Sequence, residues 1–136
     1  MSKTMTSESI MSKKIIKTNK AALPVGPYNQ AVAIGNLIYT AGQIPLDQKG
    51  NMVPGGIKEQ TEQVIQNLIA VLSAGGSSLD KVVKATVFLK DLNDFAGMNE
   101  VYGKYFKAET APARSTLQVA RIPKDSLVEI EVVAHT

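Results

Sequence analysis

The chain has no cysteine, no tryptophan and only one histidine among its 136 residues. Without cysteine it can form no disulfide, no thiolate nucleophile and no Cys-ligated metal site. The single histidine, His135, excludes a multi-histidine metal site within one chain, and its place next to the last residue predicts a mobile, solvated side chain. We therefore expect no metal, and we look for chemistry among carboxylates, arginine and tyrosine.

Long apolar runs are also missing. No stretch approaches the roughly 20 apolar residues of a membrane span, and the first residues lack the apolar core of a signal peptide. A cytoplasmic protein that does not enter a membrane is therefore expected. The Ser/Thr-rich start predicts a disordered N-terminal extension over residues 1–12, followed by a single domain over residues 13–136.

The formal net charge of +3 is small, and much of it comes from Lys13, Lys14, Lys17 and Lys20. A weak basic patch attracts phosphate polyanions without selecting among them. The chain carries no zinc-finger motif, Gly-rich phosphate loop or aromatic RNA-stacking motif beside it. Nucleic acid is therefore not the expected partner.

Residue patterns predict an α+β fold with the order β-β-β-α-β-α-β-β. Apolar residues at helical spacing predict two helices, and β-branched runs between turn residues predict strands. The predicted strands are Lys14–Lys17, Gln30–Gly35, Leu37–Gly42, Val82–Lys90, Ala111–Ala120 and Leu127–Ala134, and the predicted helices are Ile57–Ala74 and Phe95–Phe106. Proline and glycine predict a loop over Asn19–Asn29 and an exposed connection over Gln43–Gly56.

Two amphipathic helices can cover only one face of a six-stranded sheet. The last predicted strand carries one apolar row and one mixed row on its two faces. The apolar row is Val128, Ile130, Val132 and Ala134, and the mixed row is Leu127, Glu129, Glu131 and Val133. A partly charged face without a helix over it predicts an oligomer interface that encloses something polar.

Arg114 and the two carboxylates Glu129 and Glu131 lie within predicted strands, where charges need partners. Arginine presents a planar fork of donors that suits a carboxylate. On the residues alone a structural salt bridge is the simpler interpretation. A site that binds a small acid and positions a water molecule stays open as the alternative.

A series of short motifs resembles the reactive intermediate deaminase family, also called the Rid or YjgF-type family. They keep the order of that family and span about residues 13–134. The motifs are Gly26-Pro-Tyr-Asn-Gln-Ala31, Thr40-Ala-Gly-Gln-Ile-Pro45, Val83-Lys-Ala-Thr-Val-Phe88, Asp91-Leu-Asn-Asp-Phe95, Pro112-Ala-Arg-Ser115, Val119-Ala-Arg-Ile-Pro-Lys-Asp125 and Val128-Glu-Ile-Glu131. The chain is most similar to the archetypal RidA branch, because both Arg114 and Glu129 are present.

The resemblance implies a chorismate-mutase-like fold with a six-stranded mixed sheet and two helices on one face. It also implies a homotrimer with clefts between subunits. The implied reaction is hydrolytic deamination of enamines and imines, such as 2-aminoacrylate and 2-iminopropionate, to 2-keto acids and ammonia. No cofactor is implied, because the imine carbon is already electrophilic.

The resemblance also implies site residues. Arg114 would hold the substrate carboxylate, and Glu129 would orient or activate the attacking water, a role that Glu131 could share. The implied substrate-binding residues are Tyr28, Gly42, Asn99, Arg114 and Thr116. Thr116 stands where the family often has cysteine, and Ala41 where it often has serine, so the substrate range is open.

Two other functions compete with deamination. One is an RNA-directed role, as translation inhibitor or endoribonuclease, a function attributed to some relatives, with the N-terminal lysines as its support here. The other is a non-catalytic regulatory or chaperone-like trimer. A non-catalytic role would survive the replacement of Arg114, whereas RNA binding would fall steeply with salt and depend on Lys13, Lys14 and Lys17.

Overall fold

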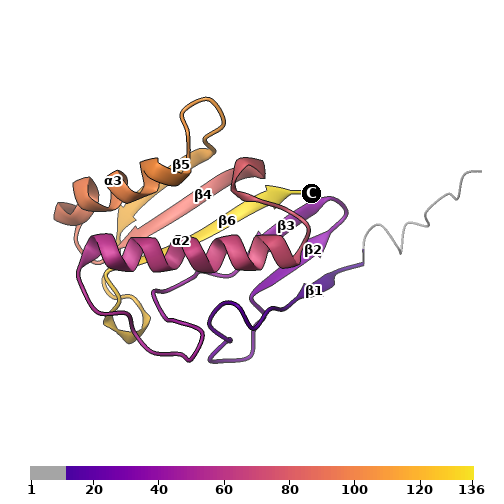
Figure 1. Ribbon diagram of the computed structural model, residues 1–136, viewed down its shortest axis with the longest axis horizontal. Coiled ribbons are helices and arrows are strands. Elements are labelled where there is room, and N and C mark those ends of the chain that lie inside the picture. Colours follow the sequence, from indigo (N-terminus) through magenta and orange to yellow (C-terminus); the bar gives the residue numbers. More distant parts are fainter. Residues whose placement is uncertain (1–11) are drawn as a thin grey trace, which may run out of the picture.

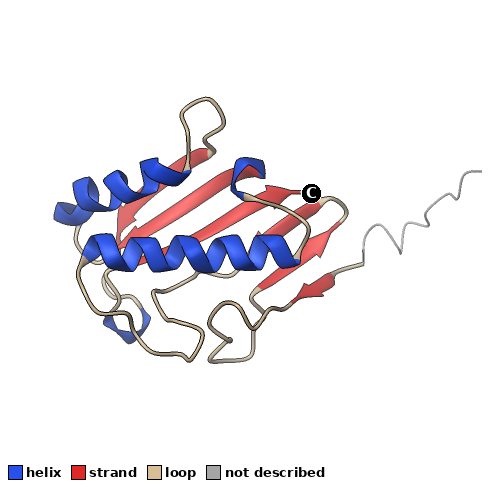
Figure 2. Ribbon diagram, viewed as in Figure 1, coloured by secondary structure: helices blue, strands red, loops and turns tan. Residues whose placement is uncertain are grey.

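The computed structural model describes residues 12–136, so the predicted disordered extension lies almost wholly outside the described residues. The predicted α+β order of elements is confirmed, with one sheet and two longer helices on the same face (Figures 1 and 2). The strands are β1 (Lys14–Ile16), β2 (Ala31–Ile34), β3 (Leu37–Thr40), β4 (Val82–Leu89), β5 (Ala113–Gln118) and β6 (Val128–His135). The helices are α2 (Ile57–Ala74) and α3 (Phe95–Tyr105), and three 3₁₀ turns are η1 (Leu79–Lys81), η2 (Leu92–Asp94) and η3 (Pro123–Asp125).

The sheet is mixed, with the order β1-β2-β3-β6-β4-β5. Only β4 and β5 run parallel, and all other neighbours are antiparallel. A parallel pair needs a crossover connection, and α3 supplies it. The last strand, β6, therefore lies in the middle of the sheet, and β5 forms an edge.

The β2–β3 hairpin turns where the sequence predicts it. Ile34 pairs with Leu37, so Gly35 and Asn36 form a two-residue turn. Gly35 has φ of 58°, a conformation that glycine adopts without the steric cost of a Cβ.

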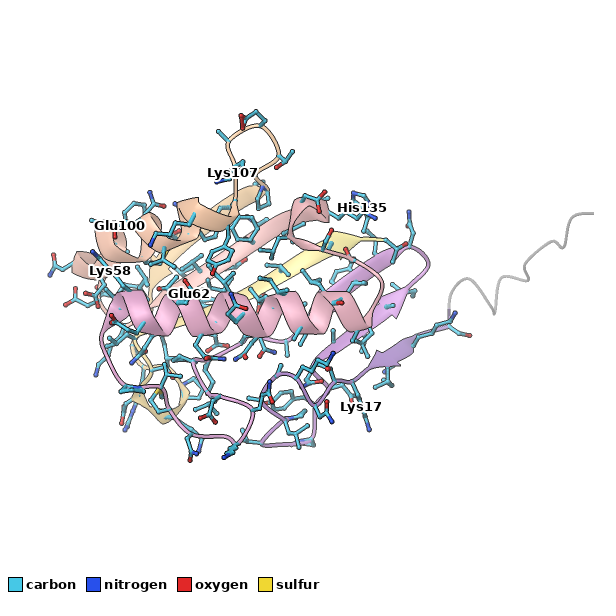
Figure 3. The ribbon with its side chains drawn as sticks, viewed as in Figure 1. Lys17, Lys58, Glu62, Glu100, Lys107 and His135 are labelled. Atoms are coloured by element: carbon cyan, nitrogen blue, oxygen red, sulfur yellow. The ribbon has the colours of Figure 1, made fainter. Side chains whose placement is uncertain are left out.

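The hydrophobic core lies between the sheet and the helices. Helix α2 buries Val64, Ile65, Leu68 and Leu72 completely, and β6 buries Val128 and Ile130 against it. At the start of the helix the Gly56 backbone N–H donates to Glu59 Oε1 at 2.8 Å, which is half of a capping box because glycine has no side chain to complete it. An ion pair of 2.9 Å between Lys58 Nζ and Glu100 Oε2 joins α2 to α3 (Figure 3).

The predicted exposed connection over Gln43–Gly56 is partly buried, so that prediction is wrong in part. In the second loop Gln43 and Leu46 are 6% and 2% exposed. The Asn67 side chain draws this loop onto α2, because its Nδ2 donates to the carbonyl oxygens of Ile44 at 3.2 Å and Leu46 at 3.0 Å. A buried amide on a helix thus replaces the solvent that loop carbonyls usually bind.

The first loop is tied down by Gln30, which is 2% exposed. Its Oε1 accepts from the Thr18 N–H at 2.8 Å, and its Nε2 donates to the carbonyls of Thr18 at 3.0 Å and Ala22 at 2.9 Å. Ala21, within this loop, is completely buried. The loop that follows β1 is therefore anchored before it reaches Tyr28.

His135 is exposed but not part of a loose terminus. It lies in β6 and pairs with Leu37 of β3 (Figure 3). The prediction of a mobile histidine is wrong, because β6 continues its ladder almost to the last residue.

The helices leave one face of the sheet uncovered, as predicted. Side chains alternate along β6, and Val128, Ile130 and Val132 face the helices. Glu129, Glu131 and Val133 therefore point to the other side, which we call the open face. No helix among residues 12–136 is both long and apolar enough to cross a membrane.

Candidate functional site

Arg114 lies on the helix side of the edge strand β5. Its partner across the ladder is Ala85, which is completely buried beneath the helices, and cross-strand partners share a face. Arg114 Nη1 donates to Asn99 Oδ1 of α3 at 2.8 Å. These two residues, both predicted for the site, are therefore brought together.

A salt bridge between Arg114 and Glu129 or Glu131, the simpler interpretation of the residues alone, is wrong. The ion pairs in the described part of the chain are Lys58–Glu100 and Arg121–Asp125, and Arg114 belongs to neither. The Arg114 charge is met by a neutral amide instead.

Two aromatic rings lie under the same guanidinium. Arg114 Cζ is 4.6 Å from the ring centre of Tyr102 and 5.5 Å from that of Phe95. The sequence assigned both rings to the core. This is correct for Tyr102, which is 6% exposed, but Phe95 is 39% exposed. Their spacing with Asn99, at i, i+4 and i+7, was the signal that all three share one helix face.

Two hydroxyl oxygens near Arg114 are buried without a hydrogen-bond partner among residues 12–136, namely Tyr102 Oη and Thr116 Oγ1. Thr116 stands two residues beyond Arg114 and shares its face of β5. Burial raises the pKa of Tyr102, while the positive charge of Arg114 acts in the opposite direction. The phenol therefore stays protonated. We call Asn99, Arg114 and Thr116 the arginine half-site.

Glu129 lies on the open face against Gly42. Gly42 follows β3, where the Gln43 N–H donates to the Ile130 carbonyl at 2.8 Å and so holds the segment beside β6. A Cβ at position 42 would come within 2.7 Å of Glu129 Cδ. The carboxylate therefore occupies the space that any side chain at position 42 would need.

The Glu129 carboxyl is half-buried and has a raised pKa. Burial is the main cause, because it disfavours the charged form, and the negative charge of Glu131 on the same face adds to it. A carboxyl with a raised pKa is better suited to exchange protons near neutral pH.

Tyr28 belongs to the same neighbourhood as Gly42, since both line one small recess beneath the first loop. Its ring is 47% exposed, and its hydroxyl accepts a hydrogen bond of 3.3 Å from the Val25 N–H. We call Tyr28, Gly42 and Glu129 the carboxylate half-site.

The two half-sites lie on opposite faces of one sheet. Ala85 pairs with both Arg114 and Val132, which places Arg114 on the helix side. Phe88 pairs with Glu129, and the odd spacing between the two β4 positions places Glu129 on the other side. One chain therefore cannot direct Arg114 and Glu129 at the same small molecule.

Residues 12–136 contain no group of three or more His, Cys, Asp or Glu side chains arranged to hold a metal ion. The residues of the two half-sites can offer carboxylate recognition by arginine and proton transfer by a carboxylate.

Known proteins match this chain over a range that includes both half-sites. The family model described as Endoribonuclease L-PSP matches residues 18–136. A RutC family protein of Pyrococcus abyssi is 56% identical over 92% of this chain and 98% of its own length. A mouse protein named 2-iminobutanoate/2-iminopropanoate deaminase is 46% identical over 90% of each chain.

Solved structures share the fold. The crystal structure of Escherichia coli TdcF with bound serine has a TM-score of 0.84 and 43% sequence identity. The match covers 90% of this chain and 98% of that one. At this identity the likeness extends to sequence as well as fold.

Proposed function

The chain belongs to the YjgF/RidA family, described as Endoribonuclease L-PSP, and we propose that it deaminates small 2-imino acids by hydrolysis. The products are 2-keto acids and ammonia, and the substrates include 2-iminopropionate and its enamine form, 2-aminoacrylate. No cofactor takes part. The mouse relative named as such a deaminase, and the TdcF structure with a bound amino acid, support this substrate class.

The observation that carries the proposal is the state of Arg114. Its guanidinium is held by Asn99 and two rings, yet it has no carboxylate partner within the described chain. An arginine fixed in this way can bind the carboxylate of a small acid through two parallel hydrogen bonds. Such a contact fixes both the orientation of the substrate and the position of its imine carbon relative to Arg114.

Glu129 supplies the base. Water adds to the carbon of the protonated imine, the new C–O bond forms, and the C=N π electrons move to nitrogen while Glu129 takes a proton from the water. The Glu129 carboxyl then gives that proton to the amine nitrogen of the tetrahedral intermediate. The C–N bond breaks and ammonia leaves, while the hydroxyl proton passes to the Glu129 carboxylate and the C=O double bond forms. The raised pKa of Glu129 suits both steps.

Because the half-sites lie on opposite faces, the working site needs two copies of the chain. We propose a homotrimer in which the arginine half-site of one copy meets the carboxylate half-site of the next. The uncovered open face offers a surface for such packing, with Tyr39 and Leu117 44% and 40% exposed.

An RNA-directed activity has weaker support. The description of the family names an endoribonuclease, and RNA cleavage commonly uses histidine for proton transfer. The single histidine, His135, lies at the end of β6 and belongs to neither half-site. The arginine and carboxylate half-sites suit a small acid better.

The proposal is tested by releasing 2-aminoacrylate from serine with a pyridoxal-phosphate dehydratase and trapping the remaining imine with semicarbazide. The protein should reduce the trapped imine, and Arg114→Ala should lower kcat/KM about a hundredfold, because two charge-assisted hydrogen bonds are lost.

Arg121→Ala is the matched control. Arg121 lies seven residues further on and forms an exposed ion pair with Asp125, so its loss should leave the rate unchanged. Imine decay no faster than in buffer, or full activity of Arg114→Ala, would remove the proposal.

A further inference from the structure

Arg114 has an unusual setting for a long, flexible side chain on an edge strand. An arginine side chain that moves freely in solution loses conformational entropy when a ligand immobilises it. An arginine that is already fixed binds its ligand without that cost. The contacts that fix Arg114 therefore bear on substrate affinity.

Three residues on one face of α3 hold the guanidinium. Asn99 accepts its Nη1 hydrogen bond at 2.8 Å, and the rings of Phe95 and Tyr102 lie 5.5 Å and 4.6 Å from Cζ. Both distances are within the range in which a cation is attracted to the face of an aromatic ring. A contact between Cζ and a ring uses no N–H donor, so donors other than the one that Asn99 accepts stay available to a carboxylate.

The Tyr102 ring belongs to the packed core. Tyr102 is 6% exposed and stacks on Phe106, with ring centres 4.3 Å apart and planes at 25°. The Lys58–Glu100 ion pair ties the same helix to α2 (Figure 3). Arg114 therefore lies against one buried ring, Tyr102, and one partly exposed ring, Phe95.

We infer that Phe95 and Tyr102 are positioning residues that hold Arg114 in its carboxylate-binding orientation. This inference rests on the proposed function. It assigns the rings a part in substrate affinity, because they act on an interaction that the substrate makes before and during the reaction. Their loss should raise KM and leave kcat nearly unchanged.

The first test replaces Phe95. Because its side chain is 39% exposed, the variant should fold like the wild type. Phe95→Leu should raise KM for 2-iminopropionate about threefold, and Tyr102→Leu about tenfold, since its ring is nearer and desolvated. Tyr102→Phe, which keeps the ring, should restore most of the affinity lost in Tyr102→Leu. Urea unfolding monitors the fold of each variant.

The second test varies the ring electronically. Fluorinated phenylalanines at position 95 keep the shape of the ring but withdraw electron density from its face. KM should rise stepwise with the number of fluorine atoms, whereas a purely structural ring would give a constant KM. Tyr105→Leu is the matched control, because Tyr105 lies on the same helix but bonds to Glu62 and Gln66.

The outcomes separate the inference from the function beneath it. If Arg114→Ala loses activity while Phe95→Leu and the fluorinated series keep the wild-type KM, the inference is overturned and the deaminase stands. If Arg114→Ala is fully active, the proposed function fails and the inference fails with it.

Discussion

At the scale of the residue, the fold treats its two principal charges differently. Arg114 keeps its charge against an amide and two rings, which leaves it ready for an acid. Glu129 is half-buried beside the like charge of Glu131, which makes its ionised form less favourable. The arrangement around Arg114 favours binding of an acid. The arrangement around Glu129 raises its pKa, which favours proton uptake by the carboxylate.

Glu129→Gln should therefore lose activity and gain stability. The pKa of Glu129 is raised in the folded chain, so the native state binds more protons than the unfolded state and stability falls as the pH rises through that pKa. Removing the charge should raise the free energy of unfolding at neutral pH, with the gain vanishing below the usual carboxyl range. Urea unfolding of the variant and the wild type, at neutral pH and below the usual carboxyl range, measures this difference in the free energy of unfolding.

The same substitution should lower kcat about 10²–10⁴-fold, the usual contribution of a general base. Glu131→Gln is the companion variant. It should stay active and move the acid limb of the pH–rate profile to lower pH, because the pKa of Glu129 falls when its like-charged neighbour is removed. An active Glu129→Gln would transfer the role to another group.

Sequence predicted part of this site. Motifs located Arg114, Asn99 and Glu129, and the structure joins Arg114 to Asn99. The role of the Phe95 ring escaped prediction, because aromatic residues at helical spacing are usually core. The salt bridge was predicted wrongly because β4 lies between β5 and β6. The faces on which Arg114 and Glu129 lie depend on the register of each strand with β4, and the sequences of β5 and β6 by themselves do not determine that register.

At the scale of the element, the end of β3 determines where Glu129 can lie. The Gln43–Ile130 bridge keeps the chain beside β6 after the regular strand has ended at Thr40. Thr40 Oγ1 accepts from the Val132 N–H at 3.0 Å, so a side chain replaces a ladder carbonyl there. Gly42 thus faces the β6 carboxylate at close range.

Gly42→Ala should displace the carboxylate and leave the fold intact. The new methyl would meet the movable end of Glu129 and not backbone, so Tm should change little, while kcat should fall about tenfold or more as the base is misplaced. Gly103→Ala is the control, because no atom lies within 4 Å of a Cβ there. Equal kcat for Gly42→Ala and wild type would contradict the geometry.

Elements with strong periodicity were predictable, and the loops between them were not. Helix α2 follows its predicted bounds, Ile57–Ala74, because its apolar stripe and the following glycines agree. The burial of Gln43 and Leu46 depends on Asn67, which is 21 residues or more away along the chain. Such long-range hydrogen bonds have no local sequence signal.

At the scale of the whole molecule, two inactive variants should restore each other. In a ring of three, mixing Arg114→Ala chains with Glu129→Gln chains should create one intact site in every mixed trimer. Equal mixing with random reassembly then predicts about one quarter of wild-type activity. Co-refolding followed by the imine assay measures it.

Each variant refolded alone should stay inactive, and a double variant carrying both substitutions should restore nothing when mixed with either single variant. Recovery far below one quarter after verified mixing would indicate that Arg114 and Glu129 do not meet across a boundary between copies.

The opposite-face placement of the half-sites has a geometric consequence. A contact that joins one surface of a copy to a different surface of the next is heterologous, and such contacts repeat without end unless the rotation between copies closes a ring. Closure of the ring therefore depends on the relative placement of the two half-sites on one chain. Substitutions that change this placement would give open filaments in place of discrete particles.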